Sequence, residues 1–108
     1  MSALEKLRKN GIILKYEDIA DLCQKYQVKE LYLFGSAIRE DFNEESDVDI
    51  LISYKPEAKV SLFEEVDLCN EISELIQRDV DIVDIEGLRN PIRREEILST
   101  REIVYAFT

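Results

Sequence analysis

The sequence predicts a mixed α/β domain, in which helices pack on one small sheet. Two observations carry this prediction: apolar stripes with helical spacing, and short apolar or alternating runs typical of strands, which follow one another along the chain. The chain has 108 residues, of which 45% are hydrophobic. A chain of this length usually forms one domain with its own core, so we expect residues 1–108 to be a single domain.

Two helices are expected before the first strand. Ser2 and Glu5 have the spacing of a capping box at the start of a short helix, which Gly11 can end. A longer amphipathic helix follows, and its apolar residues are Ile19, Leu22, Cys23 and Tyr26. Because their spacing is i, i+3, i+4 and i+7, they share one face, which should pack on the sheet.

The first two strands flank a polar stretch. Residues 31–34 are apolar and run into Gly35-Ser36, which predicts a buried strand, a tight turn and a short helix. After the polar residues 39–46, apolar side chains alternate with others from 47 to 53, and Pro56 ends the pattern. A period of two is typical of a strand with two different faces.

The second half of the chain continues this succession of helix and strand. The longest helical pattern spans residues 60–77, and a third strand follows at 80–83. Asn90-Pro91 has the residue types of an N-cap and a first helical position, and opens a helix to about residue 99. Residues 103–107 suit a terminal strand, with a docked helix end as the alternative. The expected apolar stripe of the long helix is Leu62, Phe63, Val66, Cys69, Ile72, Leu75 and Ile76.

The composition argues against several classes of function. Lys and Arg number 14 against 24 Asp and Glu, and the net charge of −10 speaks against binding nucleic acid through a basic surface. The sequence has no histidine, so neither a Ser-His-Asp triad nor a histidine-ligated zinc site can form. It shows no membrane-spanning or signal segment, so we expect a cytoplasmic protein. Cys23 and Cys69 lie in helical apolar patterns and are expected to be buried, reduced thiols.

Two pairs of aspartates are the best candidates for chemistry. Asp47 and Asp49 are two residues apart on a predicted strand, so both carboxylates point to one face, about 7 Å apart along the chain. Asp79 and Asp81 have the same spacing at the next strand. Close negative charges raise one another's pKa unless a cation lies between them, and carboxylate oxygens suit Mg²⁺. The alternative is a row of aspartates on the solvent face of a half-exposed sheet.

The turn after the first strand is a candidate phosphate site. Gly35 and Ser36 place backbone N–H groups at a helix N-terminus, where no Cβ of Gly35 obstructs a phosphate. Arg39 can add a positive charge on the same side. The alternatives are an ordinary tight turn and a surface arginine. Four more arginines form either a solvated helix face or a partner contact: Arg89, Arg93, Arg94 and Arg101.

In combination, these features resemble the minimal nucleotidyltransferases of the DNA polymerase beta superfamily. The signature of those domains is Gly-Ser, about ten residues and Asp-x-Asp, and here Gly35-Ser36 precedes Asp47-Val48-Asp49 by ten residues. The lead-in residue Ser46 and the carboxylate strand that holds Asp81 also agree, and the resemblance covers residues 26–105. The chain departs from the family pattern at Glu40, where such domains often have glycine.

The resemblance implies a nucleotidyltransferase (polymerase beta-like) fold and a site for ATP and Mg²⁺. Asp47, Asp49 and Asp81 would be the catalytic and metal-binding carboxylates, with two Mg²⁺ ions when a triphosphate is bound. Gly35 and Ser36 would cradle the β and γ phosphates, with Arg39 as a further phosphate ligand. Asp81 could accept the proton of the attacking hydroxyl, and Asp79 is the fallback for its role. The catalytic residues would therefore come from two successive predicted strands.

The resemblance also implies a partner. Minimal nucleotidyltransferases are commonly paired with a small helical HEPN-type toxin, and they transfer AMP to one of its tyrosines. We therefore expect a protein adenylyltransferase that acts as an antitoxin in a hetero-oligomer, or in a homo-oligomer of its own. The charge of −10 would suit a complementary partner surface. The alternatives are a non-catalytic antitoxin that neutralises its partner by binding alone, and transfer of a nucleotide to a small molecule.

Overall fold

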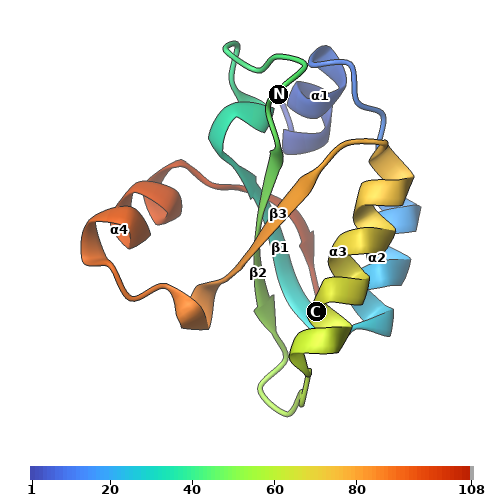
Figure 1. The fold of residues 1–108 in the computed structure, drawn as a ribbon, viewed down its shortest axis with the longest axis vertical. Helices are drawn as coiled ribbons and strands as arrows, with labels where there is room; N and C mark the ends of the chain where they lie inside the picture. The colour runs from blue at the N-terminus through green and yellow to red at the C-terminus, as the bar shows by residue number, and fades with distance from the viewer. Residues whose placement is uncertain (108) are drawn as a thin grey trace.

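A computed structural model describes residues 1–107, which form four α-helices, two short 3-10 helices and four strands (Figure 1). In chain order the elements are α1 (Ala3–Lys9), α2 (Tyr16–Lys25), β1 (Val28–Phe34), η1 (Gly35–Ile38), β2 (Val48–Tyr54), α3 (Leu62–Ile76), β3 (Val80–Asp84), η2 (Ile85–Gly87), α4 (Pro91–Thr100) and β4 (Glu102–Ala106). Every predicted helix and strand is present, and the last segment is a strand rather than a docked helix end.

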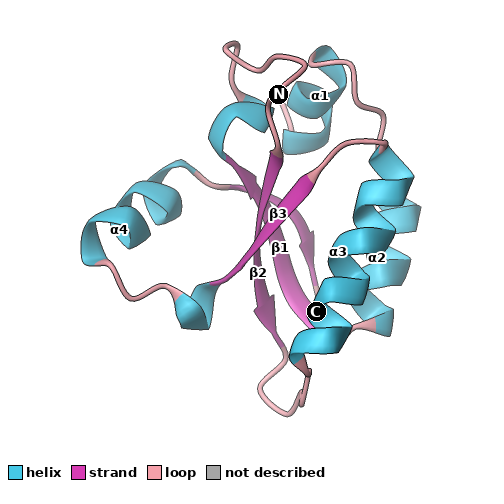
Figure 2. Ribbon diagram, viewed as in Figure 1, coloured by secondary structure: helices cyan, strands magenta, loops and turns pink. Residues whose placement is uncertain are grey.

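The strands form one mixed sheet in the order β3-β2-β1-β4 (Figure 2). β1 pairs with β2 and with β4 in antiparallel fashion, whereas β2 and β3 are parallel. The parallel pair arises because α3 connects β2 to β3 and returns the chain to the same end of the sheet. The mixed sheet with its helices confirms the predicted α/β fold class.

The main core lies between the sheet and the pair α2 and α3, which pack side by side on one face (Figure 1). Alternate residues of β2, namely Val48, Ile50 and Ile52, point into this core and are at most 1% exposed. From α3, Leu68 and Ile72 are fully buried against them. The period of two read from the sequence therefore assigns one face of β2 to the core.

A smaller core lies on the opposite face of the sheet, where α4 stands apart from α2 and α3 (Figure 1). Phe34 of β1 and Leu51 of β2 pack there against Ile97, the single buried residue of α4. Ile97 thus anchors α4 to the body, with the partly buried Leu98 packed on the same cluster, while the other residues of the helix remain partly or fully exposed.

Side chains cap the starts of α1, α3 and α4, and the caps of α1 and α4 were predicted. Ser2 and Glu5 form the predicted capping box, and Gly11 follows α1 with a φ of +87°. Ser61 and Glu64 form a second box at the start of α3. The Asn90 side chain accepts the first backbone N–H groups of α4. Such caps are worth about 1 kcal/mol each, because they satisfy N–H groups that the helix itself leaves unpaired.

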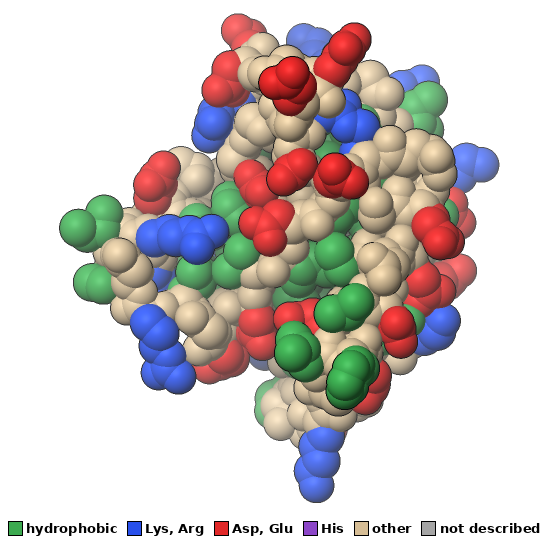
Figure 3. Space-filling model, viewed as in Figure 1, with side chains coloured by type: hydrophobic (Ala, Val, Ile, Leu, Met, Phe, Trp, Pro, Cys, Tyr) green, Lys and Arg blue, Asp and Glu red, His purple; other side chains and the backbone are tan. Residues whose placement is uncertain are grey.

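The predicted apolar stripe of α3 is wrong in its first two turns. Leu62, Phe63 and Val66 are 74%, 83% and 50% exposed, and Figure 3 shows hydrophobic side chains at the surface over this end of the helix. Leu75, also expected in the stripe, is 40% exposed. The helix rests on the sheet through Leu68, Ile72 and Ile76 instead. Helical spacing identifies residues that share a face, but no other described element reaches far enough to cover these.

Of the two cysteines predicted to be buried, only Cys23 is. Both are free, Cys23 is fully buried, and burial raises the pKa of its thiol to about 12. Cys69 is half-buried, and its thiol donates a hydrogen bond to the Val80 carbonyl oxygen at 3.2 Å. These thiols therefore remain protonated at neutral pH.

Within residues 1–107 every helix is too short or too polar to cross a membrane.

Candidate active site

The second face of β2 carries the predicted acidic pair. Asp49 is partly buried on the side of Leu51 and α4, opposite the face that enters the main core. Asp47 directly precedes β2, is exposed, and falls on the same side by the alternation of the strand. Figure 3 shows acidic side chains gathered over the beginnings of β2 and β3. The strand therefore presents carboxylates to solvent at the end where it begins.

Asp81 of β3 is the cross-strand neighbour of Asp49. The two are direct partners in the parallel register of β2 and β3, so their side chains project from the same face of adjacent strands. Neighbouring strands lie about 4.8 Å apart. Asp79 lies before β3, and its carbonyl oxygen accepts the Val48 N–H at 2.9 Å. The register thus favours Asp81 over Asp79 as the third carboxylate beside Asp49.

The negative charges around Asp49 are only partly compensated by nearby arginines. Burial raises the pKa of Asp49, and the neighbouring carboxylates of Asp81 and Asp47 raise it further, while Arg93 and Arg39 act in the opposite direction. Within residues 1–107 no three acidic or cysteine side chains converge closely enough to hold a metal ion by themselves. The donor set nevertheless fits Mg²⁺, since these are hard carboxylate oxygens whose mutual repulsion a divalent cation would relieve.

Gly35 is required by the geometry of the turn that faces Asp49. Phe34, the last residue of β1, is the register partner of Asp49 on β2, so the turn begins beside that carboxylate. Gly35 has a φ of +70°, and a Cβ placed on it would lie only 2.5 Å from Asp49 Oδ2. No other residue type fits here without moving Asp49. Ser36 and the rest of η1 follow, and no side chain caps the start of that short helix.

A pocket of about 200 Å³ lies between this turn and α4. Its lining consists of Phe34, Gly35, Arg39, Asp49, Arg93, Glu96, Ile97 and Thr100. Three predicted site residues, Gly35, Arg39 and Asp49, therefore share one cavity. Arg39 also pairs with the surface residue Asp41, through Nε at 3.0 Å, and lowers the pKa of the Asp41 carboxyl. Its guanidinium is thus partly engaged outside the pocket.

A family model described as "Polymerase beta, Nucleotidyltransferase" matches residues 17–107. The chain belongs to the polymerase beta nucleotidyltransferase family. This confirms the resemblance inferred from Gly35-Ser36 and the two aspartates of the second strand. The fold supports the assignment, since the family motif spans the junction of β1, η1 and β2 as the sequence predicted.

Two relatives of this nucleotidyltransferase are named protein adenylyltransferases. A Methanocaldococcus jannaschii protein with the provisional name protein adenylyltransferase is 38% identical over 93 residues, which cover 86% of this chain and 85% of the relative. The protein adenylyltransferase MntA of Thermococcus cleftensis is 33% identical over 85 residues, which cover 79% of this chain and 81% of the relative. In both cases the match spans most of each protein.

Solved structures show the same fold. One described as a minimal nucleotidyltransferase has a TM-score of 0.68 at 30% identity and covers 94% of both chains. A toxin–antitoxin crystal structure with AMP-PNP has a TM-score of 0.70 at 18% identity, covering 88% of this chain and 76% of that one. A complex of the tri-AMPylated Shewanella oneidensis HEPN toxin with its MNT antitoxin has a TM-score of 0.62 at 16% identity, covering 94% and 73%. The last two establish the fold alone.

The arginines of the nucleotidyltransferase's C-terminal segment do not share one solvated face. The Arg94 side chain donates to the Ile85 carbonyl oxygen at 3.1 Å, and Arg101 stacks on the Tyr32 ring with its guanidinium carbon 4.3 Å from the ring centroid. Arg93 lines the pocket that holds Asp49. Sequence reasoning missed this role of Arg93, although its spacing from Ile97 already put the two on one side of the helix.

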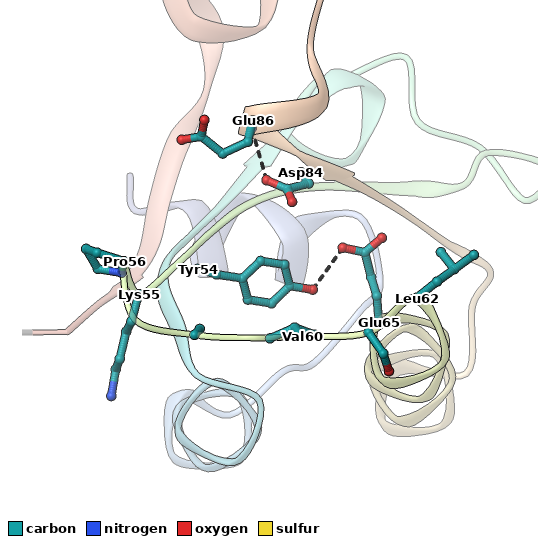
Figure 4. Close-up of a pocket in the computed structure, with 10 residues that line it drawn as sticks. Tyr54, Lys55, Pro56, Val60, Leu62, Glu65, Asp84 and Glu86 are labelled. Carbon is teal, nitrogen blue, oxygen red and sulfur yellow. Dashed lines mark hydrogen bonds between the residues drawn. The ribbon is translucent and has the colours of Figure 1, made fainter.

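A cavity of the nucleotidyltransferase that is larger than the pocket beside Asp49, about 560 Å³, lies at the opposite end of β2 (Figure 4). There the Tyr54 hydroxyl donates to Glu65 at 2.8 Å, and burial raises the pKa of Tyr54. Asp84 and Glu86 also line it, and Figure 4 shows Lys55 pointing away from the other side chains. Its lining contains no arginine and none of the predicted site residues, so size alone does not make it the substrate site.

Proposed function

We propose that this protein is a Mg²⁺-dependent protein adenylyltransferase that transfers AMP from ATP to a hydroxyl of a HEPN-type partner and thereby acts as an antitoxin. The observation that carries the proposal is the Gly35 turn set against Asp49, with Asp81 beside it in register. Two relatives that match most of the chain carry the name protein adenylyltransferase. A more distant neighbour is the antitoxin bound to an AMPylated HEPN toxin.

Asp47, Asp49 and Asp81 are the residues that would hold the metal. When bound, Mg²⁺ would supply positive charge that neutralises the phosphates and polarises their oxygens, with two ions in the triphosphate complex. Because the three carboxylates do not converge by themselves, phosphate oxygens of the nucleotide would complete the ligand set. Nucleotide and metal should therefore bind together rather than singly.

The turn between β1 and η1 would hold the far phosphates. The backbone N–H groups of Gly35 and Ser36 and the Ser36 hydroxyl would donate to the β and γ phosphates, because the start of η1 has no side-chain cap. Arg39 at the end of η1 lines the same pocket and adds a positive charge. The chain would thus orient the triphosphate with its α-phosphorus toward the carboxylates.

The chemical step is a displacement at the α-phosphorus. The acceptor hydroxyl oxygen forms the new P–O bond, the bond from the α-phosphorus to the bridging oxygen breaks, and pyrophosphate leaves. The hydroxyl proton passes to the Asp81 carboxylate, which lies on the strand next to Asp49. No oxidant or second substrate is required beyond ATP and the hydroxyl.

The acceptor would come from another chain. The pocket beside Asp49 is about 200 Å³, smaller than the roughly 300–1,000 Å³ of typical small-molecule sites. It therefore has no room for both a nucleotide and an enclosed small acceptor. A tyrosine of a helical HEPN-type partner fits an open site of this kind, and the net charge of −10 would favour a partner with a positive surface.

Thermal melting tests the nucleotide site directly. We expect a rise in Tm only when Mg²⁺ and ATP are both present, and none in Asp49→Asn. Ligand at about 100 times its Kd adds roughly 2.7 kcal/mol, a shift of several degrees for a domain of this size. A wild-type Tm that does not change with ATP and Mg²⁺ at millimolar concentrations would contradict the proposed ATP site.

A further inference from the structure

α4 forms one wall of the pocket that contains Asp49. Arg93, Glu96, Ile97 and Thr100 all line this pocket, and their spacing of i, i+3, i+4 and i+7 places them on one side of the helix. Ile97 anchors that side to Phe34 and Leu51 in the smaller core. Arg93, in the first turn of α4, is exposed and lines the same pocket as Gly35.

Arg93 differs from the other cation of the pocket in what it contacts. Arg39 donates to both carboxylate oxygens of Asp41, at 3.0 and 3.3 Å. The Arg93 side chain, by contrast, makes no hydrogen bond and no ion pair with any residue in 1–107. If Arg93 only neutralised Asp49, the two would be expected to pair within 4 Å, and the ion pairs found among those residues do not include them.

The balance of charge in the pocket indicates which class of ligand it would bind. Its lining contains the carboxylates of Asp49 and Glu96 and the guanidiniums of Arg39 and Arg93, with Asp81 next to Asp49. A metal ion held by the carboxylates would reverse the local charge and leave both guanidiniums available to an anion. A guanidinium presents planar donors that match the oxygens of a phosphate group.

We propose that Arg93 is a phosphate-binding residue, which holds the triphosphate from the α4 side of the pocket while the Gly35-Ser36 turn holds it from the other. This inference rests on the proposed ATP site. The ligand class is a polyphosphate, and the nucleoside contributes nothing to the contact.

The test compares Arg93→Gln with the matched control Arg89→Gln, which removes an exposed arginine that lines no described pocket. Isothermal titration with Mg²⁺ measures the Kd of ATP and of inorganic triphosphate for each variant. We expect the Kd of both ligands to rise about tenfold in Arg93→Gln, equivalent to about 1.4 kcal/mol. Arg89→Gln should bind as the wild type does, and Arg93→Lys should recover only part of the affinity, because it keeps the charge but not the planar donors.

Two results would overturn the inference: an unchanged Kd for both ligands in Arg93→Gln, or a weaker ATP complex with unchanged binding of inorganic triphosphate. The second would mean that Arg93 contacts the nucleoside. Tm of the ligand-free variants confirms that each is folded, and Arg93→Met, which also removes the charge, provides the same test if Arg93→Gln is not. A wild-type protein that binds neither ligand would refute the proposed ATP site itself, which is a separate failure.

Discussion

Replacing Gly35 with alanine tests whether the turn sets the position of the Asp49 carboxylate, apart from any effect on the stability of the protein. The added Cβ would lie 2.5 Å from Asp49 Oδ2, so the carboxylate must move by roughly 1 Å to reach the 3.4 Å of ordinary contact. A displacement of about 1 Å in an active site costs on the order of 100-fold in rate. We therefore predict that Gly35→Ala lowers the rate of nucleotide transfer at least about 100-fold.

Gly11→Ala is the matched control. Gly11 has a φ of +87° and Gly35 one of +70°, so an alanine at either position pays the cost of a left-handed backbone, about 1–2 kcal/mol. At Gly11, however, the new Cβ meets nothing within 4 Å. Both variants should lose several degrees in Tm, at about 4–8 °C per kcal/mol, but Gly11→Ala should keep the full transfer rate.

The assay combines thermal melts with initial rates of AMP transfer, measured well below the Tm of both variants. A Gly35→Ala protein that loses stability but transfers AMP as fast as Gly11→Ala would refute the reasoning. That result would mean that the contact between the turn and Asp49 does not set the position of the catalytic carboxylate.

Three further predictions concern single side chains. Asp49→Asn should raise the Tm of the ligand-free protein at pH 7. The pKa of Asp49 in the folded protein is above its ordinary 3.8, so the wild type loses stability as the pH rises from the ordinary pKa through the folded pKa. Melts from about pH 4 to pH 8 should show no such loss in the variant. Asp81→Asn should lower the transfer rate by at least about 100-fold, whereas Asp79→Asn should leave it within a few-fold, and equal losses would contradict the register argument. Leu68→Ala should lower the free energy of unfolding in urea by about 2–5 kcal/mol, because the side chain is fully buried. Phe63→Ala should lower it by less than about 0.5 kcal/mol, because Phe63 is 83% exposed. A large loss of stability in Phe63→Ala would mean that the start of α3 is covered.

The local features were readable from the sequence because each is set by a few neighbouring residues. The capping box of Ser2 and Glu5 depends on residues three positions apart, and the two faces of β2 depend only on alternation around Asp49. The motif that begins at Gly35 is also local, since it spans η1, the loop that follows and the start of β2. The family and most of the helix and strand positions were therefore predictable.

The remaining features depend on packing between distant segments. No pattern within β3 could say that Asp81 rather than Asp79 is the partner of Asp49, because the register is fixed by α3 and the two strands together. The exposure of Phe63 was missed because periodicity does not tell how far the sheet extends under a helix. The place of Arg93 in the pocket depends on where Ile97 packs, and Ile97 contacts residues far away in the sequence, Phe34 and Leu51 on one face of the sheet.

The most direct test of the proposed function is transfer of label from ATP labelled at the α-phosphate to a purified HEPN-type partner. We predict that the partner becomes labelled on a hydroxyl when the wild-type protein and Mg²⁺ are present, and that Asp49→Asn gives no label while the two chains still form a complex. A complex that forms, neutralises the toxin and binds ATP without ever transferring label would contradict the catalytic function, and would make this protein an antitoxin that acts by binding alone.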